Sequence, residues 1–338
     1  MPEQPPLGPD VCCIILHVMF SRIRPLAVGI ATYLPGVCSL LSRTGGTDNA
    51  RYCYSVWLRH LVAANQYAAI TGVPESVAEI GPGDSIGSGL AALLSGVRRY
   101  SAVDAVRYAS AAGNIAVFDQ LVELFAARAD IPDEAEFPLV SPKLSSYAFP
   151  RHLITDEVLR RSLAPTRISA IRDAIGTDQP RQAGAEYVTL AYVAPWTRVD
   201  ILPPSCFDMI YSQAVLEHVD QPEELYQAMY LWLKPGGCMS HDIDLSHHGI
   251  GPFWNSHWSY SDWAWRIIRG RRKWLLNRWP HSWHVDAVKN SGFTLIADIP
   301  SRTTSGISRS NLAERFRAIS DDDLVTDESY VLAVKESR

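Results

Sequence analysis

The stretch from Val77 to Leu94 constrains the fold more than any other part of the chain. A short apolar run at 77–80 leads into the turn Gly81-Pro82-Gly83-Asp84-Ser85-Ile86-Gly87, and a helical run follows. A strand that passes through a glycine-rich turn into a helix opens a parallel α/β unit. Glycine permits the tight bend and leaves no Cβ between the backbone amides and a ligand. The sequence therefore predicts an α/β protein with a ligand-binding turn.

Two common phosphate-binding turns do not fit this stretch. The frame G-x-G-x-x-G gives Gly81, Gly83 and then Ile86, which counts against a dinucleotide-binding oxidoreductase. No Gly-Lys-Ser/Thr follows the turn, so a P-loop is excluded.

The 31 Lys and Arg against 36 Asp and Glu give the chain a net charge of −5, which excludes a strongly basic nucleic-acid binder.

Acidic residues and two later motifs add to the turn. Glu79 stands just before the glycines, and Asp104 ends the next predicted strand, where a carboxylate can accept both hydroxyls of a ribose. The later motifs are Phe-Asp-Met-Ile-Tyr-Ser-Gln-Ala-Val-Leu-Glu-His-Val at 207–219 and Leu-Lys-Pro-Gly-Gly at 233–237.

With these four motifs in order, the sequence resembles the class I S-adenosylmethionine-dependent methyltransferases, over roughly 76–246 and the final strands. The resemblance implies an α/β, Rossmann-like sheet of seven strands and S-adenosyl-L-methionine as cofactor. Many members of the family have a third glycine where this chain has Ser85. The cofactor-binding residues that the resemblance implies are Gly81 and Gly83 for the methionine part, Glu79 in support of the turn, Asp104 for the ribose, the neighbourhood of Trp196 for the adenine, and Ser212.

Candidates for proton transfer cluster after the fourth and fifth predicted strands. Methyl transfer from a sulfonium needs alignment and exclusion of water, and it needs a base when the acceptor is a hydroxyl. His247 or His248 is the first choice, because imidazole titrates near neutral pH, and His218 and Glu217 are the alternatives. Asp242, Asp244 and the histidines could also bind a divalent metal through mixed oxygen and nitrogen ligands, an alternative that stays open. Their spacing is not a recognised metal motif, so no residue is assigned as a metal ligand.

A segment rich in tryptophan and basic residues follows at 254–283 and holds seven of the ten tryptophans. Such side chains can stack on sugars and hold phosphate or carboxylate groups, and they can also simply pack a helical subdomain or face a lipid surface. The run at 244–248, followed by Tyr260-Ser261-Asp262 and Asn277-Arg278, resembles bacterial methyltransferases from surface-polysaccharide gene clusters. A small-molecule or glycan acceptor is therefore expected.

The predicted organisation is an apolar, helical N-terminal arm at 1–72 and one methyltransferase domain at 73–338. That domain carries a mostly helical insertion at about 106–185, over the carboxyl ends of the strands, and a Trp-rich basic cap at about 246–285. The nearly uncharged runs Val11 to Phe20 and Pro25 to Ser42 predict an arm that packs on the domain; the alternative is an interfacial or partner-docking segment. A membrane-spanning helix is not expected, because Gly29, Pro35 and Gly36 break the second run.

The predicted function is O-methylation of a carbohydrate hydroxyl in bacterial glycan or polysaccharide biosynthesis, by a cytoplasmic enzyme. One alternative is a methyltransferase for a lipid-like or aromatic small molecule, with a peripheral contact of the arm at the inner face of the membrane. The other is a catalytically silent Rossmann-like binding module. No oligomeric state follows from the sequence.

Overall fold

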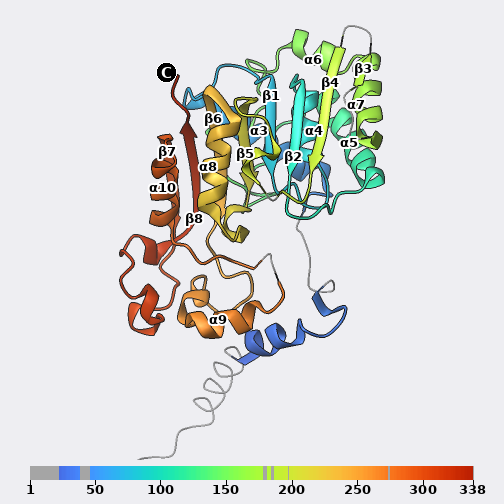
Figure 1. Cartoon of the computed structure of the whole chain (residues 1–338). Coiled ribbons are helices and arrows are strands. Elements are labelled where there is room, and N and C mark those ends of the chain that lie inside the picture. The colour runs from blue at the N-terminus through green and yellow to red at the C-terminus, as the bar shows by residue number, and fades with distance from the viewer. Residues whose placement is uncertain are drawn as a thin grey trace, which may run out of the picture.

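The computed structural model describes residues 23–38, 46–177, 181–183, 186–196, 198–272 and 275–337. One sheet with the strand order β3-β4-β2-β1-β5-β6-β8-β7 forms its centre (Figure 1). Five strands are parallel: β1 (Ser76–Ile80), β2 (Arg99–Val103), β4 (Glu186–Val193), β5 (Phe207–Gln213) and β6 (Leu233–Asp244). Strand β8 (Thr326–Val334) runs antiparallel between β6 and β7 (Thr294–Arg302). The predicted Rossmann-like sheet of seven strands is confirmed, and the short β3 (Arg181–Ala183) adds an antiparallel edge strand.

Helices cover both faces of the sheet, because neighbouring residues of a strand point to opposite faces. In β1, Val77 belongs to one apolar core and Ala78 to the other. The first core is closed by α3 (Ala50–Gln66), α4 (Gly87–Leu94), α5 (Ala111–Ala127) and α7 (Pro165–Thr177). The second is closed by α8 (Pro222–Trp232) and α10 (His281–Asn290). The remaining helices are α6 (Asp156–Ser162), α9 (Asp262–Arg269) and the 3-10 turns η1 (Val199–Ile201), η2 (Leu216–His218), η3 (Ser256–Ser259), η4 (Arg309–Asn311), η5 (Glu314–Phe316) and η6 (Asp323–Val325).

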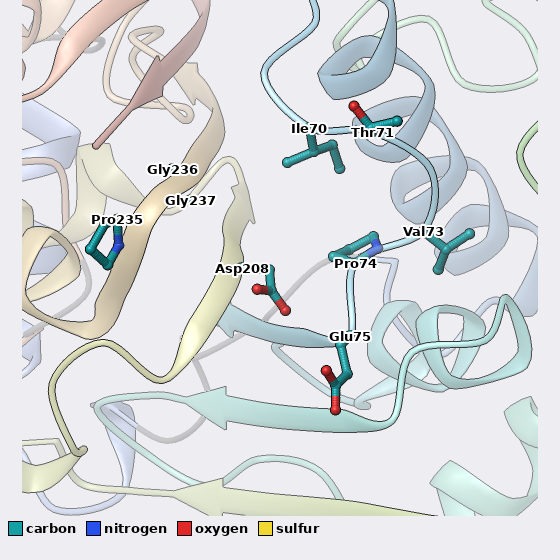
Figure 2. Close-up of a pocket in the computed structure, with 9 residues that line it drawn as sticks. All are labelled: Ile70, Thr71, Val73, Pro74, Glu75, Asp208, Pro235, Gly236 and Gly237. Atoms are coloured by element: carbon teal, nitrogen blue, oxygen red, sulfur yellow. The ribbon is translucent and has the colours of Figure 1, made fainter. Parts of the chain in front are cut away.

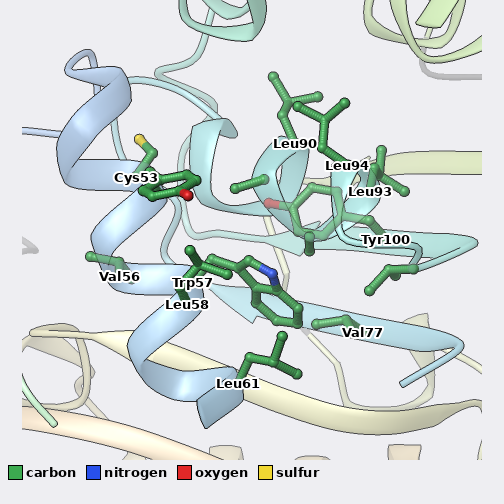
Figure 3. Close-up of a cluster of buried hydrophobic side chains, with 14 of the residues drawn as sticks. Cys53, Val56, Trp57, Leu58, Leu61, Val77, Leu90, Leu93, Leu94 and Tyr100 are labelled. Carbon is green, nitrogen blue, oxygen red and sulfur yellow. The ribbon is translucent and has the colours of Figure 1, made fainter. Parts of the chain in front are cut away.

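Helix α3 packs mainly on α4 and reaches β5 and β6 through Trp57 and His60. Trp57, Leu58 and Leu61 recur at helical spacing, and all three are fully buried against α4 and the sheet (Figure 3). The indole N–H of Trp57 donates to Ser95 Oγ at 2.8 Å, so the largest side chain of this core also satisfies its polar atom. Helix α3 lies within the segment 1–72 that the sequence predicted as a helical arm.

The insertion at 106–185 lies differently from the prediction. Its helices α5 and α7 do not cover the carboxyl ends of the strands; α5 packs on α3 and α4, and α7 packs on β4. The apolar sides of these helices join the first core, because an open sheet face offers them more apolar surface than a sheet edge does. The loop at 131–150 does reach the carboxyl edge, where Ser141 donates a hydrogen bond to Glu328.

The cap and the N-terminal segment lie beyond the carboxyl ends of the strands. Figure 1 shows α9 beside the blue helix of residues 23–31. The Arg271 N–H donates to Thr32 Oγ1 at 2.9 Å, and a Cβ on Gly29 would lie 2.0 Å from the Ile267 carbonyl oxygen, so the two segments are in close contact. Packing of this part of the predicted arm on the domain is thus observed; Val11 to Phe20 lies outside the described residues. Among the described residues, no helix combines the length and apolar character that crossing a bilayer requires.

Candidate functional site

The glycine-rich turn after β1 requires its glycines. Gly81 and Gly83 have φ of +66° and +74°, a region that side chains with a Cβ rarely adopt. A Cβ on Gly81 would lie 2.6 Å from Val215 Cγ1, at the end of β5. The Gly81 N–H donates to the Val103 carbonyl at 2.8 Å. The turn therefore lies between the ends of β2 and β5, as the prediction for Gly81 and Gly83 requires.

Asp104 lies directly against this turn. Its Oδ1 accepts hydrogen bonds from the N–H groups of Ala105, at 2.6 Å, and Val106, at 3.3 Å. The Gly83 N–H lies near enough to the carboxylate to lower its pKa. Burial nevertheless raises the pKa of Asp104. The tertiary structure thus joins two features that are about twenty residues apart in the sequence, a glycine turn and a carboxylate.

Glu79 supports the turn from inside the core. Its carboxylate accepts hydrogen bonds from Ser88 and from Tyr100, the latter at 2.5 Å, and Ser88 Oγ lies 3.0 Å from the Tyr211 hydroxyl. Burial raises the pKa of Glu79 to about 7. These partners enclose the side chain, which is consistent with the predicted role of Glu79 in supporting the turn; its place in the cofactor-binding set stays a prediction.

The departure at Ser85 has a structural reason. Its hydroxyl donates to the Thr47 carbonyl, and its N–H donates to Thr47 Oγ1 at 3.1 Å. The close approach that a third glycine provides occurs at Gly87 instead, where a Cβ would lie 2.4 Å from the Cys53 sulfur. The segment before α3 therefore covers the turn and replaces part of the usual glycine pattern.

Trp196 and Ser212 differ in their access to this turn. The Trp196 N–H donates to the Asp104 carbonyl at 2.9 Å, so the residue stands next to the predicted ribose site, with its ring edge-on to Trp232 at 6.2 Å. Ser212 is fully buried within β5, and its Oγ lies 2.7 Å from His241 Nδ1. The burial of Ser212 argues against direct contact with a cofactor, because its hydroxyl already has a partner inside the sheet.

Across the edge from Asp104, three of the four predicted catalytic side chains come together. Glu217 Oε1 lies 3.7 Å from His218 Nε2 after β5, and the ring centroids of His218 and His248 are 5.0 Å apart. His248 Nε2 lies 3.3 Å from Asp244 Oδ2 at the end of β6. Glu217, His218 and His248 each offer one potential ligand atom, and these atoms all lie within 4.8 Å of one another. The sequence left metal binding open and assigned no ligands; the structure brings these three potential ligands together from two strand ends.

His247 already uses one ring nitrogen within its own loop. Its Nδ1 accepts a hydrogen bond from the Ile250 N–H at 3.0 Å, so the lone pair that a base would need is occupied. Burial also lowers the pKa of His247. His241 and Asp242, two titratable residues of β6, are buried inside the sheet. Of the two neighbouring histidines after β6, the geometry favours His248.

The pKa values of the two carboxyl groups beside these histidines are shifted in opposite directions. Burial, together with the nearby charge of Asp244, raises the pKa of Glu217 well above its ordinary value. Burial acts to raise the pKa of Asp244 as well, but the hydrogen bond and the charge of His248 hold it down at about 2. A neutral or cation-bound Glu217 beside an ionised Asp244 is therefore the arrangement that the site favours.

Asn277 and Tyr52 contribute to this site, although sequence reasoning gave neither a role in it. The Asn277 side-chain amide donates to the carbonyls of Leu216, at 2.8 Å, and Val219, at 3.0 Å, and its N–H donates to the Glu217 carbonyl at 2.7 Å. Tyr52 on α3 is partly buried, and desolvation, together with the charges of Asp242 and Glu217, raises its pKa. Both come from segments remote in sequence, and no local motif marks them.

The Trp-rich cap is largely a packed subdomain. Trp254, Trp258 and Trp265 are buried, and the buried Arg278 lies over the Trp265 ring and is paired with Asp262 at 2.6 Å. Trp274 lies outside the described residues. Packing, the simpler of the predicted roles, thus holds for these three tryptophans.

A cavity of about 320 Å³ lies elsewhere, at the opposite edge of the sheet (Figure 2). It is bordered by 70–75, Asp208 and the Pro235-Gly236-Gly237 turn, next to the amino ends of β1, β5 and β6. Ligands of open α/β sheets bind at the carboxyl ends of the strands, so this cavity is separate from the site of the turn and the cluster.

A family model and several solved structures are similar to this chain. Residues 163–240, from the end of the insertion to β6, match the family model described as "Methyltransferase domain". No curated protein matches the chain. Among solved structures, the S-adenosylmethionine dependent methyltransferase from Mesorhizobium loti is 13% identical with a TM-score of 0.37, over 79% of this chain and 94% of its own. Phosphoethanolamine N-methyltransferase 2 from Haemonchus contortus, in complex with S-adenosyl-L-methionine, is 14% identical with a TM-score of 0.38, over 88% of this chain and 60% of its own. Likenesses this distant carry no argument about the acceptor.

Proposed function

We propose that this chain is a class I S-adenosylmethionine-dependent methyltransferase that transfers the methyl group of that cofactor to a hydroxyl group of a small-molecule acceptor; its fold and its matched domain support this. The observation that carries the proposal is that the Gly81 and Gly83 turn and Asp104 stand together at the ends of β1 and β2, with a cluster of imidazoles and a carboxylate at the neighbouring strand ends.

The cofactor is held on the β1 and β2 side of the edge. The Gly81 and Gly83 turn would lie along its methionine part, where the absence of Cβ atoms lets the backbone approach closely. Asp104 would accept hydrogen bonds from the two ribose hydroxyls. Trp196 would stand beside the adenine, because its backbone N–H is hydrogen-bonded to the Asp104 carbonyl.

The acceptor is held on the β5 and β6 side. Methyl transfer is an in-line displacement, so the acceptor oxygen must face the methyl group from the side opposite the sulfur. A hydroxyl also has to lose its proton in the course of the reaction. Glu217, His218 and His248 are the groups at this edge that suit such an acceptor, and Asn277 positions the turn that carries the first two.

A carbohydrate is the preferred acceptor. A polyhydroxyl compound suits the polar cluster, and the half-buried, stacked pair of Trp279 and Trp283, with centroids 4.5 Å apart, offers aromatic surface of the kind on which sugars stack. One observation favours the second candidate, a lipid-like or aromatic acceptor met at a membrane surface. It is a group of exposed apolar side chains on the N-terminal segment and α9, at Ile23, Ile30, Tyr33, Leu34 and Trp263.

Calorimetric titration tests the cofactor assignment. The wild type should bind S-adenosylmethionine and not NADH, and Asp104→Ala should bind the sulfonium at least about tenfold more weakly, because it loses a charge-assisted pair of hydrogen bonds. Asp173→Ala, which removes an exposed carboxylate on α7, serves as the matched control. Unchanged affinity in Asp104→Ala would remove the ribose assignment, and failure to bind the sulfonium would restore the silent-module alternative.

Transfer of a labelled methyl group tests the acceptor class. Sugars and nucleotide sugars are compared with catechols and long-chain alcohols. Label in the carbohydrate fraction supports the first candidate, and label confined to the apolar acceptors supports the second.

A further inference from the structure

We propose that Glu217, His218 and His248 bind a divalent transition-metal ion, and that Asp244 orients His248 as a ligand of that ion. The potential ligand atoms of the three residues lie within 4.8 Å of one another. Small side-chain rotations would bring them to the separation of at most about 4.2 Å that bonds of about 2.1 Å to a single ion require. The inference deepens the proposed function and rests on its placement of the acceptor beside this cluster.

The burial of the Glu217 carboxylate without a hydrogen bond is an independent observation that supports a bound cation. Its side chain is 3% exposed, and neither carboxylate oxygen accepts a hydrogen bond from the described residues. A buried carboxylate without hydrogen bonds or a full counter-charge costs several kcal/mol. Asp242 and Asp244 lie close enough to add repulsion. A bound cation would satisfy both oxygens and offset this repulsion.

The donor set selects the class of metal. Two imidazoles and one carboxylate suit Mn²⁺, Co²⁺ or Zn²⁺, whereas Mg²⁺ and Ca²⁺ prefer sites made of oxygen alone. The side chains of His218 and His248 are 29% and 33% exposed, so one side of the cluster is open to the acceptor. Three protein ligands with an open position form the arrangement of a catalytic site rather than of a closed structural one.

Two neighbours hold the ligands in place. Asp244 Oδ2 lies 3.3 Å from His248 Nε2. A carboxylate in such contact with a metal-binding imidazole fixes its tautomer and the orientation of its ring. Asn277 anchors the backbone on both sides of Glu217 and His218 from the cap. The site is therefore held by β5, β6 and the cap together.

The ion would act on the acceptor hydroxyl. Coordination lowers the pKa of a hydroxyl, so its proton passes to water at neutral pH. The oxygen then forms a bond to the methyl carbon while the carbon–sulfur bond breaks, and the electron pair of that bond stays on the sulfur as a neutral thioether. No oxidant or reductant is consumed.

Titration of the metal-free full-length protein with Co²⁺ tests the inference without any turnover. The visible absorption of Co²⁺ should saturate at one ion per chain, and Zn²⁺ should displace it. His248→Asn should lower the affinity at least about 100-fold, and Asp244→Asn by about 10- to 100-fold, because loss of an outer partner costs that much. Asparagine is chosen because it tolerates the positive φ of +44° at position 248.

The matched control is His247→Asn, which removes the adjacent imidazole outside the proposed ligand set. It should bind Co²⁺ as the wild type does. Glu217→Gln should abolish saturable binding, and circular dichroism checks its fold; if it does not fold, the exposed His248 position still decides the question. Equal affinities in His247→Asn and His248→Asn, or no saturable binding by the wild type, would overturn the site.

The two proposals fail separately. If S-adenosylmethionine binds and full turnover persists in a chelator, the metal inference is wrong while the methyltransferase function stands. If Co²⁺ binds as predicted but S-adenosylmethionine does not, the metal site stands and the proposed function is wrong.

Discussion

Burial of Glu79 should make the protein less stable as the pH rises. The folded-state pKa of this residue is about 7, against 4.5 for an exposed glutamate. Below pH 4.5 Glu79 is protonated in the folded and the unfolded protein, so its burial does not lower the free energy of unfolding through a change of charge. Between these values the unfolded chain releases the proton while the folded chain keeps it, so the free energy of unfolding falls as the pH rises. At 1.36 kcal/mol per pKa unit, the total loss by pH 8 is roughly 3 kcal/mol.

Glu79→Gln removes this titration and keeps the shape of the side chain. The free energy of unfolding of both proteins is measured in urea, without ligand, near pH 5.5 and pH 8. The difference between the two proteins separates the contribution of Glu79 from that of the other acidic residues. Relative to the wild type, the variant should gain roughly 2 kcal/mol between the two pH values. Glu75→Gln, at an exposed position just before β1, is the matched control and should follow the wild type.

Tyr100→Phe extends the test. The Tyr100 hydroxyl donates to Glu79 and so favours the charged carboxylate; its removal should raise the pKa of Glu79 further and steepen the pH dependence. An identical pH dependence in wild type and Glu79→Gln would refute the reasoning, because it would mean that Glu79 does not change its protonation on unfolding in this range.

Three further outcomes are expected. Gly81→Ala should destabilise the fold by roughly 2–4 kcal/mol, from the positive φ and the contact with Val215, and Val215→Ala should relieve the second part; additive effects in urea unfolding would exclude the contact. Asn277→Ala should cost about 1–3 kcal/mol and reduce turnover more than cofactor affinity, because it leaves two carbonyls unpaired beside Glu217; equal losses of both would point to a general defect. Trp263→Ala should weaken sedimentation with phosphatidylglycerol vesicles if the exposed apolar group meets a membrane, and no binding by the wild type would dispose of that idea.

The cap shows where sequence reasoning met its limit. Seven tryptophans and a run of basic residues permit a sugar site, a lipid surface or a packed subdomain. The choice depends on which side chains other segments cover. Phe316, from a segment near the C-terminus, stacks on Trp258, and Asp262 pairs with Arg278. Local composition cannot report such partners.

The sequence by itself determined the elements that depend on local chemistry. Glycines at 81 and 83 are readable because a tight turn with positive φ leaves little choice, and the strands and helices around them follow from the spacing of apolar residues. Tertiary structure alone decided which titratable groups meet. Neighbouring histidines at 247 and 248 look equivalent in sequence, yet one hydrogen-bonds within its own loop and the other reaches Asp244 and His218. Distances of a few ångströms between the ends of separate strands set the chemistry of the site, and only the packed sheet fixes them.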